Sequence, residues 1–164
     1  MIPGLVVVLE DVPPEGLERA LDVSPEALAA LVAGGEEEPP AFVSALTGAL
    51  RLRLLGTRLE VRGSFQVGVN LACDRCLALT QAVLTGEIEE SLFLETSVST
   101  SAGGGGEEEG LAVTDGRVDL AGLLAESFWL AWPYRFICRP DCAGLCPACG
   151  ADLNQGPCGC EHLA

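Results

Sequence analysis

The eight cysteines are the feature that most restricts how this 164-residue chain can fold, because they occur as four closely spaced pairs. Two pairs have the spacing C-x-x-C, one is C-x-x-x-C and one is C-x-C. Thiol pairs with such spacings bring their sulfurs to one tetrahedral ion, at about 2.3 Å for zinc, and four thiolates leave no open coordination position. We therefore predict two structural zinc sites, whose ligands are Cys73, Cys76, Cys138, Cys142, Cys146, Cys149, Cys158 and Cys160.

The positions of the pairs indicate how they divide between the two sites. Gly150 follows the second C-x-x-C pair, and a glycine there lets backbone N–H groups turn toward the sulfurs of a zinc site. We assign to one site Cys146, Cys149, Cys158 and Cys160, and to the other Cys73, Cys76, Cys138 and Cys142. Because Cys142 and Cys146 are near enough in the sequence to exchange roles, the assignment is a hypothesis.

Two other uses of cysteine compete with zinc. Residues 1–4 contain no basic side chain and the apolar run 5–9 is too short for a secretory signal, so we expect a cytoplasmic protein, in which metal is favoured over disulfides. A redox C-x-x-C pair lies at a helix N-terminus after a strand. Cys146 and Cys149 lie instead among Pro, Gly, Asp and Asn, with no helical periodicity after them. Thiol–disulfide chemistry is therefore the alternative function, not the favoured one.

The charge of the chain bears on its partners. It has 24 acidic residues and 9 arginines, with no lysine, for a formal net charge of -15. Binding to nucleic acid depends on Lys and Arg that neutralise phosphates, so this balance favours a basic protein partner over direct RNA contact. A local basic face for RNA is the competing hypothesis, formed by Arg51, Arg53, Arg58 and Arg62 with Arg75. No apolar run reaches the ~18 residues of a membrane span.

The middle of the chain has the pattern of β-strands. Residues 58–73 alternate strictly enough to predict a strand with one buried face, formed by Leu59, Val61, Phe65, Val67, Val69 and Leu71. Cys73 continues the buried parity, with Cys76 across a tight turn. Similar alternation in residues 50–54 and 82–94 predicts neighbouring strands, the first joined by a hairpin at Gly56 and Thr57. The strands form a meander, curved where Gly63, Gly68 and Gly86 mark bulges or bends.

The remaining segments predict helices, strands and a loop around this meander. Residues 5–9 are a first strand, residues 15–22 a short helix, and a second helix begins at Ser24 and Pro25. The Gly-rich, then acidic, residues 96–110 predict a mobile loop, and residues 111–118 a last strand. A helix capped by Asp119 runs to residue 130, with an inner face of Leu120, Leu123, Leu124, Ser127 and Phe128.

These elements predict an α+β fold: a curved antiparallel β-sheet or partly open barrel with N-terminal helices, one later helix and a cysteine-rich zinc tail. The α+β domain covers residues 1–133, and the tail, residues 134–164, packs on it. Four aromatic residues lie just before the tail: Trp129, Trp132, Tyr134 and Phe136. We expect them to anchor the tail to the sheet, in preference to stacking on RNA bases.

Several of these segments resemble the YceD family, the large ribosomal RNA subunit accumulation proteins of bacteria and plastids. The resemblance covers residues 45–164 and includes the strand that ends in CDRCL, the acidic loop, VDL with its helix, and the tail pattern C-x-G-L-C-P-x-C-G-x-x-L-N. It implies support of the synthesis, processing or stability of large-subunit ribosomal RNA. A ribosomal protein or an assembly factor is then the expected partner, and ribosomal RNA contact is direct or indirect.

The resemblance implies no catalytic residues, and the sequence supplies no convincing set. A hydrolase would need paired carboxylates around a metal, or a histidine beside a nucleophile. His162 is the only histidine and is the third residue from the end of the sequence, while the carboxylates occur mostly in runs such as 36–38 and 107–109. We therefore expect a non-enzymatic protein without a small-molecule substrate.

Overall fold

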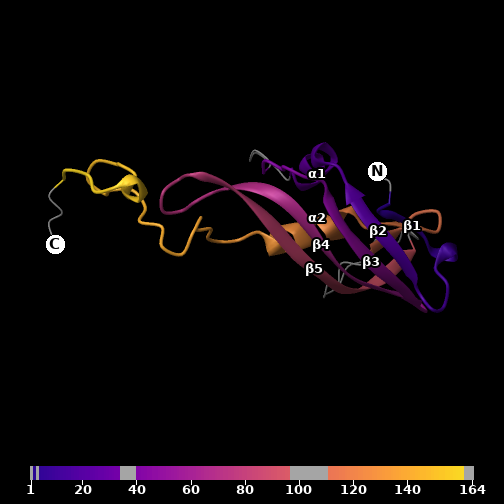
Figure 1. The fold of residues 1–164 in the computed structure, drawn as a ribbon. Helices are drawn as coiled ribbons and strands as arrows, with labels where there is room; N and C mark the ends of the chain where they lie inside the picture. Colours follow the sequence, from indigo (N-terminus) through magenta and orange to yellow (C-terminus); the bar gives the residue numbers. More distant parts are fainter. Residues whose placement is uncertain (1, 3, 34–39, 97–110, 161–164) are drawn as a thin grey trace, which may run out of the picture.

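The computed structural model describes residue 2 and residues 4–33, 40–96 and 111–160, which form a curved sheet with two helices (Figure 1). The strands are β1 (Val6–Val8), β2 (Leu17–Val23), β3 (Leu46–Leu55), β4 (Arg58–Ala72), β5 (Leu79–Thr96), β6 (Leu111–Val113) and β7 (Arg117–Asp119). The helices are α1 (Pro25–Val32) and α2 (Ala121–Ala131), and short 3-10 turns lie at Leu9–Asp11 and Leu153–Gln155.

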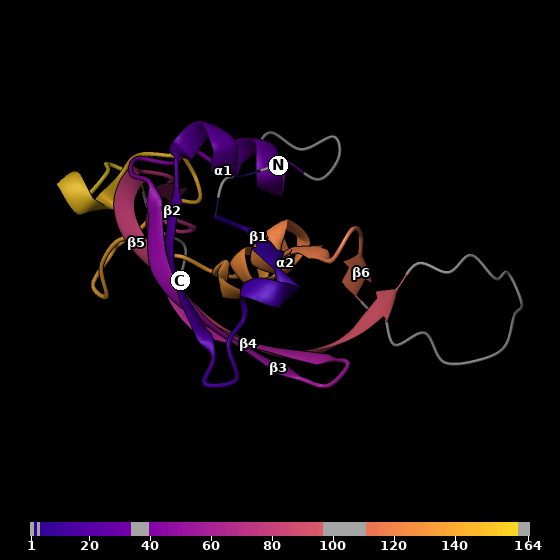
Figure 2. The ribbon, with the colours of Figure 1, turned by 90° about the vertical axis from the view of Figure 1, so that its right-hand side faces the viewer.

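The main sheet has the order β2-β3-β4-β5-β6, and β1 pairs with β7 in a second, two-stranded sheet. The predicted meander is confirmed, because β3, β4 and β5 are consecutive antiparallel neighbours. Among the described strands neither sheet closes on itself, so the structure has the predicted curved sheet and not the predicted partly open barrel. Figure 2 shows the sheet curving around α2 and β1. Of the two alternatives predicted for Gly63, Gly68 and Gly86, bulges are wrong, because the register of β4 and β5 is continuous through these residues, and bends stay a prediction.

The core lies between the concave face of the sheet and α2. Every apolar residue predicted to face inward from residues 58–73 is buried, and Cys73 is fully buried with them. The inner face of α2 is also as predicted, since Leu123, Leu124, Ser127 and Phe128 are buried. Asp119 accepts a hydrogen bond from the N–H of Ala121 at 2.9 Å, which satisfies one free donor of the first turn. The sequence pattern therefore places both layers of the core correctly.

Two predictions for the flanking segments are wrong. Residues 15–22 do not form a helix; they contribute to β2, which pairs with β3 from Leu17 to Val23. The unpaired edge of β3 decides this, because pairing with it satisfies the backbone groups of an alternating segment. One N-terminal α-helix is found in the described residues, beginning where Ser24 accepts a hydrogen bond from Ala27. Residues 111–118 hold parts of two strands instead of one, and the first of them is parallel to the end of β5.

The segment after α2 leaves the sheet and runs to the tip of the β4–β5 hairpin, and the last described residues lie beyond that tip (Figure 1). Phe136 and Trp132 are partly buried against the core, whereas the side chain of Tyr134 is fully exposed. The predicted loop of residues 96–110 lies outside the described residues except for Thr96, which ends β5. None of the helices in the described ranges is long and apolar enough to cross a membrane.

Candidate metal centres

The first group of cysteines is built on the turn between β4 and β5. Cys73 directly follows β4, and its N–H donates to the carbonyl of Ala78 at 3.0 Å. Leu77 closes the turn by donating its N–H to the carbonyl of Cys73 at 2.8 Å, with a positive φ of 61°. This tight turn brings Cys76 to the same end of the hairpin as Cys73.

The tail supplies the other two cysteines because its first residues are fastened to that turn. The N–H of Asp74 donates to the carbonyl of Phe136 at 2.9 Å, and the N–H of Phe136 donates back to the Asp74 carboxylate at 2.6 Å. This reciprocal pair directs the following residues across the turn. The result is the strand-turn cluster, formed by Cys73, Cys76, Cys138 and Cys142.

The sulfurs of the strand-turn cluster have the spacing of a tetrahedral metal site. The sulfur of Cys73 lies 3.9 Å from that of Cys142, and the sulfur of Cys76 lies 3.8 Å from that of Cys138. Four sulfurs around one zinc ion at about 2.3 Å lie about 3.8 Å from one another, whereas a disulfide bond is about 2.05 Å long. The backbone N–H groups of Arg75 and Cys138 both point to the Cys73 sulfur at 3.4 Å, as they would to a thiolate. These residues fit a structural metal ion.

The second group, the tail cluster, contains Cys146, Cys149, Cys158 and Cys160, whose sulfurs all lie within 4.8 Å of one another. Gly150 closes the turn, with φ of 74° and its N–H donating to the carbonyl of Cys146 at 2.8 Å. Cys146 is buried, but Cys149 is exposed and the remaining two are half-buried. The structure therefore brings together the two sets of four that the sequence assigned, with the strand-turn cluster better shielded from solvent.

Each cluster contains thiols whose pKa values differ widely. The backbone N–H of Cys138 contributes most to lowering the pKa of Cys73 to about 6, whereas burial raises the pKa of Cys138 to about 12. In the tail cluster, backbone N–H groups, first that of Cys149, lower the pKa of Cys146 to about 6. The neighbouring Cys149 thiol raises the pKa of Cys160 to about 12. In each cluster, therefore, a metal ion would displace a proton more easily from the thiol whose pKa is lowered than from the thiol whose pKa is raised.

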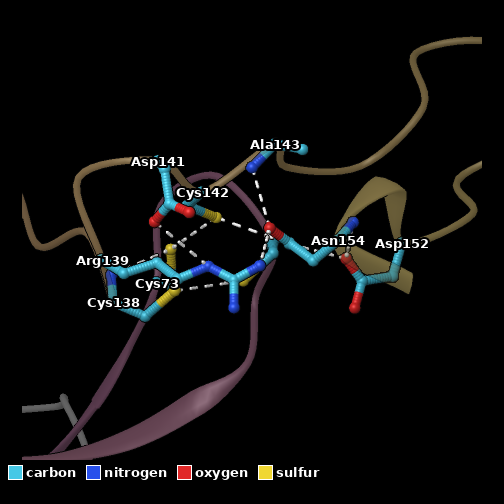
Figure 3. Close-up of polar contacts among 9 residues, drawn as sticks. Cys73, Cys138, Arg139, Asp141, Cys142, Ala143, Asp152 and Asn154 are labelled. Carbon is cyan, nitrogen blue, oxygen red and sulfur yellow. Dashed lines mark hydrogen bonds and ion pairs between the residues drawn. The ribbon is translucent and has the colours of Figure 1, made fainter. Parts of the chain in front are cut away.

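Asn154 extends its side chain toward the strand-turn cluster, as Figure 3 shows. Its side-chain oxygen accepts hydrogen bonds from the Arg139 guanidinium and from the N–H of Ala143, both at 2.8 Å. Its amide nitrogen donates to the Asp152 carboxylate at 2.7 Å and to the Cys142 sulfur at 3.5 Å. A residue from the loop of the tail cluster therefore contacts a sulfur of the strand-turn cluster.

Asn154 had no predicted role, although it is the last residue of the tail pattern. Gly144 had none either; it adopts a φ of 78° and lies so close to the turn that a Cβ would be 3.0 Å from the carbonyl oxygen of Arg75. Leu145 then donates its N–H to that same oxygen at 3.0 Å. Both residues are fixed letters of the tail pattern, Gly144 in its G-L pair and Asn154 in its L-N pair, and this was the sequence signal for their contacts.

We expect Asn154→Ala to loosen the tail. It would leave the N–H of Ala143 and the Arg139 side chain without their acceptor, at a cost of about 1–3 kcal/mol if these groups are not resolvated. Amide hydrogen exchange should then accelerate in residues 138–155 and stay unchanged in β3. The control is Gln155→Ala, which removes a longer, exposed hydrogen bond to Asp152 at 3.2 Å. Equal exchange in the two variants would contradict the role given to Asn154.

The predicted basic face is crossed by carboxylates. Arg51 and Arg62 face each other across β3 and β4, but Arg62 forms an ion pair with Glu89 at 3.1 Å. Arg53 lies opposite Glu60 in the same register, and the Arg58 guanidinium covers the Phe93 ring at 4.4 Å. The arginines therefore belong to a mixed polar face of the sheet.

Comparison with known proteins places the chain in a family. The family model of the large ribosomal RNA subunit accumulation protein YceD matches residues 61–163. This chain belongs to the YceD family. The match includes β4 with the strand-turn cluster, α2 and the tail cluster, and it supports a ribosome-related role.

The curated relatives are longer than this chain. Uncharacterized proteins of Mycobacterium bovis and Mycobacterium tuberculosis are 31% identical over 108 residues, which is 66% of this chain and 51% of theirs. An uncharacterized protein of Mycobacterium leprae is 28% identical over 112 residues, which is 66% of this chain and 49% of that protein. The chain therefore spans about half the length of the curated relatives it matches. No solved structure matches it.

Proposed function

We propose that this chain is a non-enzymatic factor that supports the synthesis, processing or stability of large-subunit ribosomal RNA by binding a basic ribosomal protein or an assembly factor. Membership of the YceD family carries the ribosomal part of this proposal. The net charge of -15 supports a basic protein as the partner that is contacted directly. In this proposal the chain acts in the cytoplasm, and its contact with ribosomal RNA is indirect.

The proposal includes two structural zinc ions, one in each cluster. The sulfur separations of 3.8 and 3.9 Å in the strand-turn cluster support it, as does the supply of four thiols to each site. Zinc held by four thiolates has no open position for a substrate or an activated water, so it stabilises the fold instead of supplying chemistry. A redox role has less support, because Cys73 and Cys76 lie in a hairpin turn and not at the start of a helix.

Binding measurements at several salt concentrations test the choice of partner. The zinc-loaded chain is titrated with individual large-subunit ribosomal proteins and with fragments of precursor ribosomal RNA. We expect at least one basic protein to bind, and no RNA to bind even at low salt. RNA affinity that falls steeply with the logarithm of salt concentration would contradict the proposal, because such a slope reports direct phosphate contact.

A charge-reversed variant makes this test more specific. Arg51→Glu combined with Arg62→Glu removes the two arginines that face each other on the sheet. Indirect RNA contact predicts that association with ribosomal particles is unchanged in this variant. Loss of association together with loss of RNA binding would support the competing basic-face hypothesis instead.

A further inference from the structure

The outer face of the main sheet, turned away from α2 (Figure 2), carries a hollow that the metal clusters do not use. A hollow of about 710 Å³ lies across β3, β4 and β5, and one of about 370 Å³ adjoins it through Thr47 and Gln66, which line both. Together they form what we call the outer trough, whose outward side chains belong to Val43, Thr47, Ala49, Ser64, Gln66, Val83, Thr85 and Glu87.

The floor of the trough is formed by small or uncharged residues of β4, and the side chains of Val43 and Ser44 pack over Gly68. Gly68 lies between Val43 and Val83 in the pairing across the sheet, and a Cβ there would lie 2.7 Å from the Val43 side chain. The N–H of Gly68 is already satisfied by the Ser44 hydroxyl at 2.8 Å. Further along β4, the outward positions are Gln66 and Ser64. The floor of the trough is therefore uncharged, and the N–H of Gly68 already has its hydrogen-bond partner.

Exposed apolar side chains line one end of the trough. Val83 is 69% exposed and Val43 is 42% exposed, on either side of Gly68. On the same face of β5, Leu79 lies nearer the hairpin tip and is 75% exposed, with the polar side chain of Gln81 between it and Val83. The exposed side chains of Val43 and Val83 give this end of the trough apolar surface that a partner could cover.

The charges at the other end are acidic. Glu87 lines the trough on β5, and Asp22 of β2 lies opposite Thr47 on the other side. The ion pairs found among the described residues join Arg62 to Glu89 and Arg139 to Asp141, so neither of these two carboxylates has an ion-pair partner there. No arginine lines the trough in the described part of the chain. Glu87 is the charged side chain in the lining of the trough, and Arg51 and Arg62 come next on the same face, where Arg62 is paired with Glu89.

We infer that the outer trough binds a protein segment that carries lysine or arginine beside small apolar side chains. One cationic group would lie near Glu87 on β5 or near Asp22 on β2, which are three strands apart, and the apolar side chains would cover Val43 and Val83. Charge complementarity selects this partner over RNA. The inference rests on the proposed function, to which it adds the surface that contacts the basic partner.

The test uses peptides selected without reference to the ribosome. A random-peptide phage library is selected on the immobilised zinc-loaded chain, and enriched peptides are synthesised and their dissociation constants measured. We expect enriched peptides to carry net positive charge. Thr85→Trp, which fills the trough, and Glu87→Arg, which reverses its rim charge, should each weaken their binding by about tenfold or more.

Matched variants outside the trough serve as controls. Ser91→Trp places the same ring on the outer face of β5 opposite Glu60, and Glu15→Arg makes the same charge change in the exposed turn before β2. Both should bind the peptides as the unmodified chain does. The inference is overturned if no basic peptide is enriched, if the trough variants bind as well as the controls, or if a single-stranded RNA oligonucleotide binds and loses its binding in Thr85→Trp.

The outcome is separable from that of the proposed function. The comparison of the trough variants with their controls tests the trough, whereas the panel of ribosomal proteins tests the biological partner. If the trough binds basic peptides but the chain binds no ribosomal protein or assembly factor, the trough is a binding surface and the proposed function is wrong. If Thr85→Trp binds a ribosomal protein as well as the unmodified chain does, the proposed function stands and the trough is not the surface that contacts the partner.

Discussion

Cys73→Ser is expected to lower the zinc content from two ions to one per chain and to release the whole tail from the sheet. Cys73 is fully buried, its sulfur lies 3.9 Å from that of Cys142, and it accepts hydrogen bonds from two backbone N–H groups. A serine hydroxyl is a poor zinc ligand, and the binding free energy of a structural zinc site, about 10–16 kcal/mol in small zinc domains, is also folding free energy. Losing this one ligand should therefore remove most of what orders residues 136–155.

Cys149→Ser is the matched comparison, because it also removes one thiol from one cluster. Cys149 is exposed and belongs to the tail cluster, beyond the contacts between Asp74 and Phe136. We expect this variant to lose one zinc ion as well, but to keep residues 136–142 fastened to the hairpin turn. Metal analysis by mass spectrometry counts the ions, and amide hydrogen exchange shows where protection is lost.

The two variants should differ in the extent of that loss. In Cys73→Ser exchange should accelerate from residue 73 through 78 and along the tail, whereas in Cys149→Ser it should accelerate only in residues 145–160. Two zinc ions retained in Cys73→Ser would contradict the assignment of the strand-turn cluster. Identical exchange in both variants would show that the clusters fold as one unit.

The sequence predicted the cysteine groups well because short-spaced pairs leave little freedom. Cys73 and Cys76 are the only thiols outside the tail, so a four-thiol site that includes them must take two from it. Parity was equally informative for β4, where each inward side chain is set by a period of two residues. The grouping of the cysteines and the buried face of β4 could both be predicted, because each follows from the spacing of residues within a short segment.

The parts that the sequence could not predict depend on contacts between distant segments. β2 was predicted as a helix because the deciding factor is the free edge of β3, some thirty residues later in the chain. The parallel pairing of β6 with the end of β5 and the contact of Asn154 with the Cys142 sulfur are set by how segments meet in space. The outer trough likewise needs three strands in register before its small side chains form one surface.

Gly86→Ala is expected to destabilise the sheet by about 3 kcal/mol, because the space for a side chain at this position is already filled. A Cβ on Gly86 would overlap the ring of Phe65, which lies opposite it on β4 and is only 3% exposed. The ring cannot move outward without opening the core between the sheet and α2. Urea unfolding of the zinc-loaded chain, followed by circular dichroism, measures the change in the free energy of unfolding.

Two further variants show whether this overlap is the cause. Phe65→Leu shortens the opposing side chain, so the double variant Gly86→Ala with Phe65→Leu should be less destabilised than the sum of the two single changes. Gly122→Ala is the control, because Gly122 lies on the exposed side of α2 with no atom near the position of its Cβ. Alanine there should raise stability by about 0.5–1 kcal/mol through its higher helix propensity. Additive effects in the double variant would mean that Gly86 is required for the backbone of β5 and not for the packing of Phe65.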